Sequence, residues 1–190
     1  ENLRRVGDKL RADFLQSAVG KIVISEDEAD LARSIRKAIS VSTLGRNVLM
    51  SPNGRSEVSC YWRDEETGVL CRARCDRIVD DVIVDLKTTQ DARLSEFQRA
   101  VSKYKYHLSA AFYVDGFTKV FGSPHSFAWV AAEKAKPHGI AFYGADDLLL
   151  ETGRAEYKLA LRAYRDHAAS SFATGYPETF INLSLPGWYS

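Results

Sequence analysis

The chain of 190 residues carries 26 basic and 25 acidic side chains, a net charge of +1, and 45% of its residues are hydrophobic. These values are ordinary for a globular protein, so we expect a single domain over residues 1–190 with room for a sizeable core. No apolar run approaches the roughly 20 residues that span a bilayer, and the first residues lack a secretory core, so we expect a cytoplasmic protein and no membrane partner. The near-neutral charge excludes a broadly basic surface, so any DNA-binding surface must come from local clusters.

The first part of the chain predicts two helices followed by a loop. Apolar residues recur at helical spacing within residues 1–19, which predicts an amphipathic helix. Ser25 and Glu28 form a capping-box pattern, which predicts the start of a second helix with Ile35 and Ile39 on its apolar stripe. Residues 42–56 are rich in glycine and asparagine, which predicts a loop.

The next stretch predicts neighbouring strands joined by tight turns. Its residues alternate between apolar and polar types or form short β-branched runs, as strands of a partly buried sheet do. The predicted strands are 57–63, 69–75, 76–79 and 82–86, with turns at 64–68 and 80–81. Antiparallel pairing of 76–79 with 82–86 would bring Asp76 and Asp85 close together.

Acidic residues on these strands predict a metal site. A carboxylate removed from water costs several kcal/mol, roughly, unless it has a charged partner or a metal ion. Alternation places Asp85 and Lys87 on one face of their strand and Leu86 on the other. Mg²⁺ or Mn²⁺ bound to two such acids can activate water for phosphodiester hydrolysis, while a lysine stabilises negative charge. The sequence therefore predicts a hydrolase acting on nucleic acid.

The remaining elements complete an α/β fold. Apolar spacing from Leu94 to Phe112 predicts one continuous helix that covers the sheet, including Phe97, Val101 and Tyr104 on its apolar stripe. Residues 126–132 and 139–143 predict a second hairpin, and residues 146–169 predict a long helix. We expect a central mixed sheet from residues 57–87 and 126–143, with helices on its faces.

The spacing of Asp76 from Asp85-Leu86-Lys87 resembles the motif of the PD-(D/E)xK nuclease superfamily, with Cys75-Asp76 in place of the frequent Pro-Asp. Longer runs resemble the RecE-type exonuclease (exonuclease VIII) domain of phages and prophages. They are WxDEETGVLCRARCDRI at 62–78, IVDLKTTxDA at 83–92, YKYHLSAAFYVDG at 104–116, GKIVISEDE at 20–28 and LSLPGW at 183–188.

This resemblance implies a Mg²⁺-dependent deoxyribonuclease acting 5′ to 3′ on linear double-stranded DNA ends. It would leave 3′ overhangs for recombination by a single-strand annealing partner (RecT-like), and its relatives form homo-oligomeric rings. The implied metal ligands are Asp76, Asp85 and the Leu86 carbonyl, and Lys87 is the implied catalytic lysine. Superfamily members often add a glutamate before the first core strand, and Glu57 stands there, either as a ligand or as a solvent-facing strand terminus.

The chain departs from the resemblance at two positions. Relatives carry a histidine metal ligand on a helix before the first strand, whereas the earliest histidine here is His107, so we expect that an upstream helical segment is missing. Ser109 stands four residues before Tyr113, where a longer glutamine is common, and Gln98 is too distant to replace it. These departures keep two alternatives open: a DNA-binding module that has lost catalysis, and an endonuclease on the same fold.

Six side chains are predicted to contact DNA. Arginines near clustered acids either neutralise them or hold phosphates beside the metal ion. The predicted DNA-binding residues are Arg72, Arg74, Arg77, Lys103, Tyr104 and His107. Tyrosines on a mostly apolar helix also suit core packing, and His107 equally suits a hydrogen bond on the helix surface.

Three cysteines lie in the predicted strands, at positions 60, 71 and 75. Some relatives bind an iron–sulfur cluster through four cysteines, a set that these three do not complete. We therefore expect buried, reduced thiols.

Overall fold

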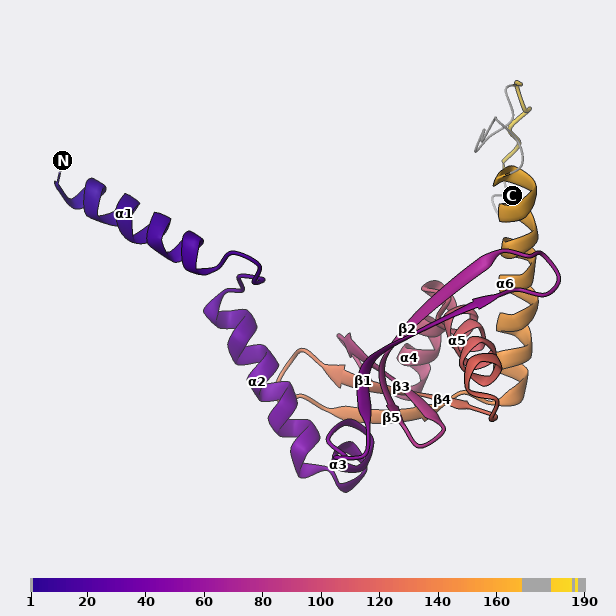
Figure 1. The fold of residues 1–190 in the computed structure, drawn as a ribbon, viewed down its shortest axis with the longest axis horizontal. Helices are drawn as coiled ribbons and strands as arrows, with labels where there is room; N and C mark the ends of the chain where they lie inside the picture. The colour runs from indigo at the N-terminus through magenta and orange to yellow at the C-terminus, as the bar shows by residue number, and fades with distance from the viewer. Residues whose placement is uncertain (1, 169–178, 186, 188–190) are drawn as a thin grey trace.

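Five strands form one sheet in the order β1-β2-β3-β4-β5 (Figure 1). They are β1 (Arg55–Arg63), β2 (Leu70–Val79), β3 (Val82–Thr89), β4 (Ser126–Glu133) and β5 (Ile140–Gly144). Strands β3 and β4 pair in parallel, and the other neighbours pair in antiparallel fashion. This computed structural model describes residues 2–168, 179–185 and 187, with side chains from residue 8 onward. The predicted mixed sheet is confirmed.

Helices cover both faces of the sheet. They are α1 (Asn2–Ser17), α2 (Glu26–Val41), α3 (Thr43–Leu49), α4 (Leu94–Lys103), α5 (Tyr106–Phe121) and α6 (Asp147–Ala168). Figure 1 shows α1 projecting away from the rest of the chain, whereas α6 runs beside α5. Helices α4 and α5 form the crossover that parallel pairing of β3 and β4 requires.

The main core lies between α4 and α5 and one face of the sheet. Alternate residues of β1 and β2, such as Cys60 and Cys75, contribute to it together with Ile83 of β3, Trp129 of β4 and Phe117 of α5. All five side chains are at most 2% exposed. Burial of this apolar surface is the main source of stability for the sheet.

A smaller core lies on the opposite face, under α2. Ile35 and Ile39 pack with Ala132 of β4, and Leu86 of β3 joins the same cluster. The predicted capping box is present, because the Ser25 side chain accepts a hydrogen bond from the Glu28 amide at 3.2 Å. The cap begins α2 where its buried stripe can meet the sheet.

Two predictions about elements are wrong. Residues 42–56 were predicted as a loop, but Thr43–Leu49 forms α3, because Ser42 caps it by accepting a hydrogen bond from the Gly45 amide at 3.1 Å. The continuous helix predicted from Leu94 is broken, because Lys105 adopts a left-handed conformation with φ of 57°. Because of the break, the apolar stripe of α4 does not continue along α5, so the residues of α5 that face the sheet differ from those predicted for one continuous helix.

Helix α5 approaches its neighbours closely through two glycines. A Cβ atom added to Gly116 would meet the Trp62 ring at 2.4 Å, and one added to Gly153 of α6 would meet the His107 carbonyl oxygen at 2.1 Å. These approaches bring β1 and α6 against α5. Ion pairs extend the contact to the hairpin turn, where Arg162 meets Glu66.

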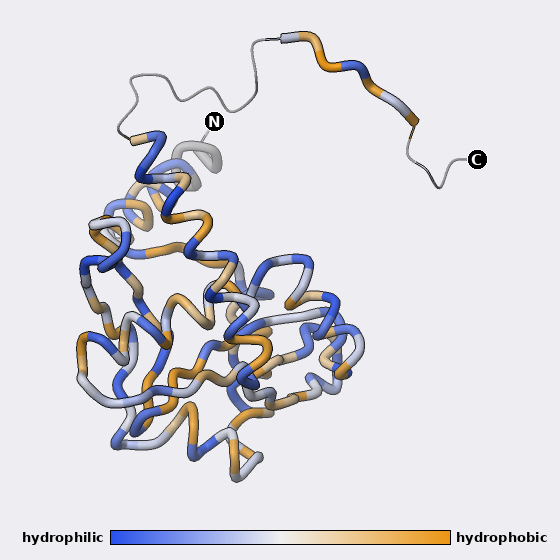
Figure 2. Tube along the Cα trace, turned by 90° about the vertical axis from the view of Figure 1, so that its right-hand side faces the viewer, coloured by the Kyte–Doolittle hydropathy of each residue, from blue (hydrophilic) through white to orange (hydrophobic). Residues whose placement is uncertain are grey.

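The ends of the chain expose apolar side chains. Leu10 and Phe14 of α1 are 65% and 55% exposed, although their spacing predicts an amphipathic helix. At the other end, residues 179–185 run away from the body of the protein (Figure 2), and Phe180 and Leu183 are almost fully exposed. None of the helices in the described part of the chain is long and apolar enough to cross a membrane.

The three cysteines are free and buried, as predicted. Burial raises the pKa of the Cys60 thiol to about 11 and also raises the pKa of Cys71 and Cys75. A thiol with a raised pKa is a poor nucleophile and a poor metal ligand at neutral pH, because both reactions need the thiolate.

Candidate active site

Strand β3 carries the centre of the candidate site. Asp85 and Lys87 line a cavity of about 160 Å³ together with Ser109 and Tyr113 of α5. Leu86, between them, points to the opposite face and packs in the α2 cluster. The predicted alternation along this strand is therefore confirmed.

Asp76 lies across the ladder, at the end of the β2–β3 pairing. The register pairs Arg77 with Val84, which confirms the predicted antiparallel arrangement. An Asp76 carboxylate oxygen accepts a hydrogen bond from the Leu86 amide at 3.0 Å. Asp76 and Glu57 line a groove of about 880 Å³ beneath α2, so Asp76 and Asp85 line neighbouring cavities on either side of β3 rather than one shared cavity.

The charges of these residues are coupled. Burial raises the pKa of Asp85, and the negative charge of Asp76 adds to the rise, while the Lys87 ammonium opposes it. The Lys87 Nζ atom lies 2.6 Å from the Asp85 Oδ2 atom. That oxygen is buried, and the Lys87 ammonium is its partner. Since the pKa of Asp85 is raised despite this partner, Lys87 offsets the burial and the Asp76 charge only in part, which favours binding of a further cation.

Glu57 is held by an arginine on the neighbouring strand. Its carboxylate lies 2.9 Å from the Arg74 guanidinium, and both side chains are more than half exposed. Glu57 adopts a positive φ of 54°, which is uncommon for a residue with a side chain. It borders the Asp76 groove and lies inside β1 rather than at a terminus, so the prediction of a strand terminus is wrong, although the side chain does face solvent, and the ligand role stays a prediction.

The arginines of β2 fall into two groups. Arg72 and Arg74 are exposed on the sheet face away from α5, and the Arg72 guanidinium lies 5.7 Å from the centre of the Tyr61 ring. Arg77 instead donates hydrogen bonds to the Ser56 hydroxyl and the Ser51 carbonyl, which fixes the segment before β1. Arg72 is thus placed to contact a ligand, and Arg74 would first have to leave Glu57, whereas Arg77 is held by hydrogen bonds within the protein.

The α4–α5 junction brings Lys103 and Tyr104 to the same region as Lys87. The three side chains line one cavity, together with Tyr106. Tyr104 was predicted on the buried stripe of a continuous helix, but it is 57% exposed, because the chain breaks at the next residue. The prediction that Tyr104 packs in the core is therefore wrong. The alternative, that Tyr104 contacts DNA, stays a prediction.

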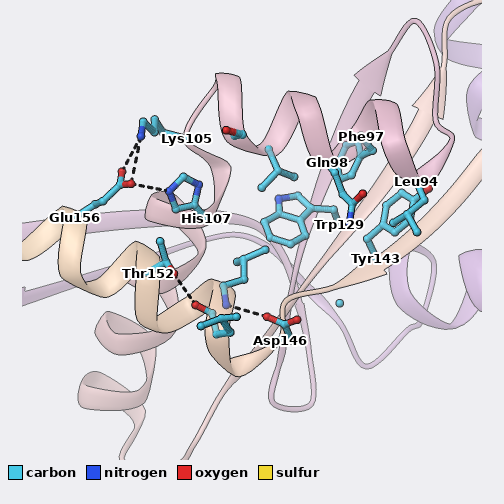
Figure 3. Close-up of a pocket in the computed structure, with 15 residues that line it drawn as sticks. Leu94, Phe97, Gln98, Lys105, His107, Trp129, Tyr143, Asp146, Thr152 and Glu156 are labelled. Carbon is cyan, nitrogen blue, oxygen red and sulfur yellow. Dashed lines mark hydrogen bonds and ion pairs between the residues drawn. The ribbon is translucent and has the colours of Figure 1, made fainter.

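His107 points away from the candidate site. It is buried, and its Nε2 atom lies 3.2 Å from a Glu156 carboxylate oxygen, which Lys105 also contacts (Figure 3). These residues line a separate pocket between α4 and α6. The contact with Glu156 therefore favours a hydrogen-bonding role for His107 over contact with a DNA phosphate. The bond joins α5 to α6, whereas it was predicted on the helix surface.

Tyr113 belongs to the site but was not predicted as a site residue. Burial raises the pKa of its hydroxyl, and the negative charges of Asp85 and Asp76 raise it further. The sequence did hold a signal for Tyr113, because relatives commonly carry a glutamine four residues before this tyrosine. Ser109, four residues earlier, does line the Asp85 cavity.

The donor set fits a divalent cation only in part. Two carboxylates and the Leu86 carbonyl supply hard oxygen ligands, as Mg²⁺ and Mn²⁺ prefer. In the described part of the chain, however, no three His, Cys, Asp or Glu side chains gather closely enough to hold a metal ion. The remaining ligands would therefore be waters and substrate oxygens, which is common for Mg²⁺.

Comparison with known proteins gives a family match. The family model of a PDDEXK-like domain of unknown function, DUF3799, matches residues 5–179. No curated protein matches the chain significantly.

One solved structure shows a similar fold. A candidate exonuclease from Eubacterium rectale is 16% identical, with a TM-score of 0.58 over 74% of this chain and 55% of that one. The chain thus spans about half the length of that protein. The match to the structure of SSO0001 covers 72% of this chain and 58% of the SSO0001 chain, with 13% sequence identity and a TM-score of 0.40.

Proposed function

Because this chain belongs to the PDDEXK-like family DUF3799, we propose that it is a metal-dependent deoxyribonuclease that degrades linear double-stranded DNA from its ends. The observation that carries the proposal is the arrangement around Asp85. The buried Asp85 carboxylate lies 2.6 Å from the Lys87 ammonium, and the negative charge of Asp76, on the neighbouring strand, raises its pKa. If the Lys87–Asp85 ion pair had only a structural role, the additional negative charge of Asp76 would not be needed.

The residues that would hold the cation are Asp76, Asp85 and the Leu86 carbonyl, with Glu57 as a further ligand if it leaves Arg74. When bound, Mg²⁺ or Mn²⁺ would neutralise these acids and lower the pKa of a water molecule for attack on a phosphodiester. Removal of one acid would leave the other unable to hold the ion. Both carboxylates are therefore expected to be necessary.

Lys87 would orient the attacking water and stabilise the charge that develops on the phosphate. The Lys87 side chain is 30% exposed and its ammonium already lies at the Asp85 carboxylate, so it can meet both a bound water and a phosphate oxygen. Preorganised charge of this kind contributes more in a partly buried site than in water. The exposed Arg72 and Arg74 would bind neighbouring phosphates of the substrate.

The finer features of the proposal are supported by the sequence resemblance to RecE-type exonucleases. It supports 5′-to-3′ degradation, 3′ overhangs and delivery of these to an annealing partner in recombination. A homo-oligomeric ring around DNA belongs to the same proposal. The family match supports the PD-(D/E)xK superfamily more broadly than this particular group.

The test is digestion of linear duplex DNA labelled at either the 5′ or the 3′ end, with and without Mg²⁺ or Mn²⁺. We expect early release of the 5′ label and no cleavage in excess EDTA. Lys87→Ala should reduce the rate by at least about a hundredfold, as loss of a transition-state charge does. Full activity of Lys87→Ala would contradict the proposal.

A closed circular duplex distinguishes the alternatives. It should resist digestion, because the proposed enzyme requires an end. Cleavage of the circle would identify an endonuclease on the same fold. Binding of duplex without cleavage under any metal would identify a DNA-binding module.

A further inference from the structure

A second cavity opens on the other side of Lys87. It has a volume of about 500 Å³ and is bordered by the end of β3, by α4 and by the α4–α5 junction. Lys87 lines both this cavity and the smaller one that contains Asp85. A molecule in the second cavity would therefore lie directly beside the proposed catalytic lysine.

Stacked aromatic rings form part of the wall of this cavity. The Tyr104 and Tyr106 rings lie 5.6 Å apart at an angle of 25°, and the Lys87 ammonium lies 5.0 Å from the centre of the Tyr106 ring. Tyr104 is 57% exposed. Tyr104 thus packs on Tyr106, and the Lys103 ammonium lies 5.2 Å from the centre of the Tyr104 ring, so a stacked base would displace this ammonium from the ring.

The charges around the cavity favour an anion. Its acids already have partners, because Glu96 pairs with Arg99 at 2.9 Å and Asp91 pairs with Arg93 at 2.6 Å. Lys103 and Lys134 also line the cavity, and neither makes an ion pair with any residue that the structure describes. Two cations without acidic partners thus lie beside an exposed aromatic ring.

We propose that this cavity binds one unpaired nucleotide of the DNA strand, with its base on Tyr104 and its phosphate at Lys103 and Lys134. The inference rests on the proposed function. It adds that the end of the DNA strand is separated from its complementary strand when it is bound. The volume lies within the range of roughly 300–1,000 Å³ that is typical of small-ligand sites.

The base must be unpaired for a geometric reason. Within a duplex, each internal base is covered by its neighbours on both faces, and a terminal base is still held by its complement, so a single base enters the cavity only after it leaves its pair. Stacking of successive bases on aromatic side chains is the usual way in which proteins hold single strands. The next phosphodiester of the same strand would then reach Lys87.

The inference can be tested without cleavage, in the Lys87→Ala background. The probe is a single-stranded thymidine oligonucleotide with one terminal 2-aminopurine, whose fluorescence is quenched when the base stacks. We expect quenching on binding, and a roughly tenfold weaker Kd for Tyr104→Ala, as expected for the loss of one base stack. Tyr104→Phe keeps the ring and should bind nearly as Lys87→Ala does.

Tyr164→Ala serves as the matched control, because Tyr164 is also exposed, at 62%, but lies on α6 and outside the cavity. It should bind as tightly as the Lys87→Ala parent. Equal binding by the Tyr104→Ala and Tyr164→Ala variants, or no quenching by the parent, would overturn the inference. Thermal melting of each variant checks that the fold is retained.

The outcomes also separate this inference from the proposed function. If the wild-type protein degrades duplex DNA but Tyr104→Ala has no effect on binding, the nucleotide site is wrong and the nuclease proposal stands. If the quenching depends on Tyr104 but no metal supports cleavage, the site stands and the nuclease proposal is wrong.

Discussion

Asp85 combines burial with a nearby like charge, and this combination has a measurable consequence. A bound divalent cation would relieve the repulsion between Asp85 and Asp76, so it should stabilise the folded protein. A metal concentration of 100 times Kd would add about 2.7 kcal/mol to the free energy of unfolding.

We therefore expect the melting temperature of the wild-type protein to rise when Mg²⁺ or Mn²⁺ is added after EDTA treatment. Asp85→Asn should show almost no metal-dependent rise, because it removes one ligand charge. Glu65→Gln, in the exposed hairpin turn, is the matched control and should respond as wild type does. An undiminished metal response in Asp85→Asn would rule out Asp85 as a ligand.

Tyr113 gives a second prediction for a single residue. Its hydroxyl lies close enough to Asp85 and Asp76 for their charges to raise its pKa, so it can donate a hydrogen bond near the attacking water. Tyr113→Phe should lower kcat by about two- to tenfold, corresponding to one hydrogen bond of about 0.5–1.5 kcal/mol. Steady-state kinetics on end-labelled DNA would check this, and a change in KM alone would contradict it.

At this scale the sequence predicted much of the site, because a tight turn fixes the pairing of β2 with β3. The pairing is as expected, but it brings the Asp76 carboxylate to the Leu86 amide, whereas the expected neighbour of Asp76 was Asp85. The sequence could not show that Arg77 would turn to Ser51 and Ser56, since these contacts depend on how the preceding segment folds back. It also could not place His107 against Glu156, which is far along the chain.

Among the elements, the contact between α5 and α6 depends on a missing side chain. Gly153 allows α6 to approach the His107 carbonyl, and a methyl group there would overlap with backbone rather than with a movable side chain. Gly153→Ala should therefore destabilise the protein by about 1–3 kcal/mol, as overpacking of a tight contact does.

Chemical denaturation measures this change in the free energy of unfolding. Gly144→Ala is the matched control, because an added Cβ atom at Gly144 meets no atom within 4 Å. Its unfolding free energy should stay much closer to that of wild type. Equal stability of the Gly153→Ala and wild-type proteins would mean that α6 does not pack on α5 as closely as described.

The elements themselves were predictable where periodicity or a cap marked them. The strands and the start of α2 followed from alternation and from the Ser25 capping box. The break at Lys105 did not, because a lysine in a left-handed conformation has no local sequence signal. Contacts of Lys105 with Glu156 of α6 help to hold this conformation, and such contacts are visible only in the folded protein.

For the whole molecule, the three buried thiols report on global stability. Their side chains are buried on strands β1 and β2, so they should react with a thiol reagent only when this part of the sheet opens. We expect slow labelling of the native protein at pH 8 and rapid labelling of all three thiols in denaturant. Rapid labelling without denaturant would contradict the described burial.

The raised thiol pKa also sets the direction of a pH effect. The pKa of Cys60 is about 11 in the folded protein, against 9.0 for an unperturbed thiol. Between these values the unfolded chain loses the thiol proton while the folded chain keeps it, so this group lowers the free energy of unfolding as pH rises. Denaturation curves across this range should show the fall, and Cys60→Ala should show less of it.

The short β2–β3 hairpin, finally, has a consequence for how the protein acquires its activity. Its strands are adjacent in sequence, so they can pair with little loss of chain entropy, whereas the parallel pairing of β3 with β4 must wait for the longer crossover. The Asp76 carboxylate would then reach the Leu86 amide early in folding, before the surrounding helices dock. A divalent cation present during refolding could accordingly speed the nucleation step as well as support the mature enzyme.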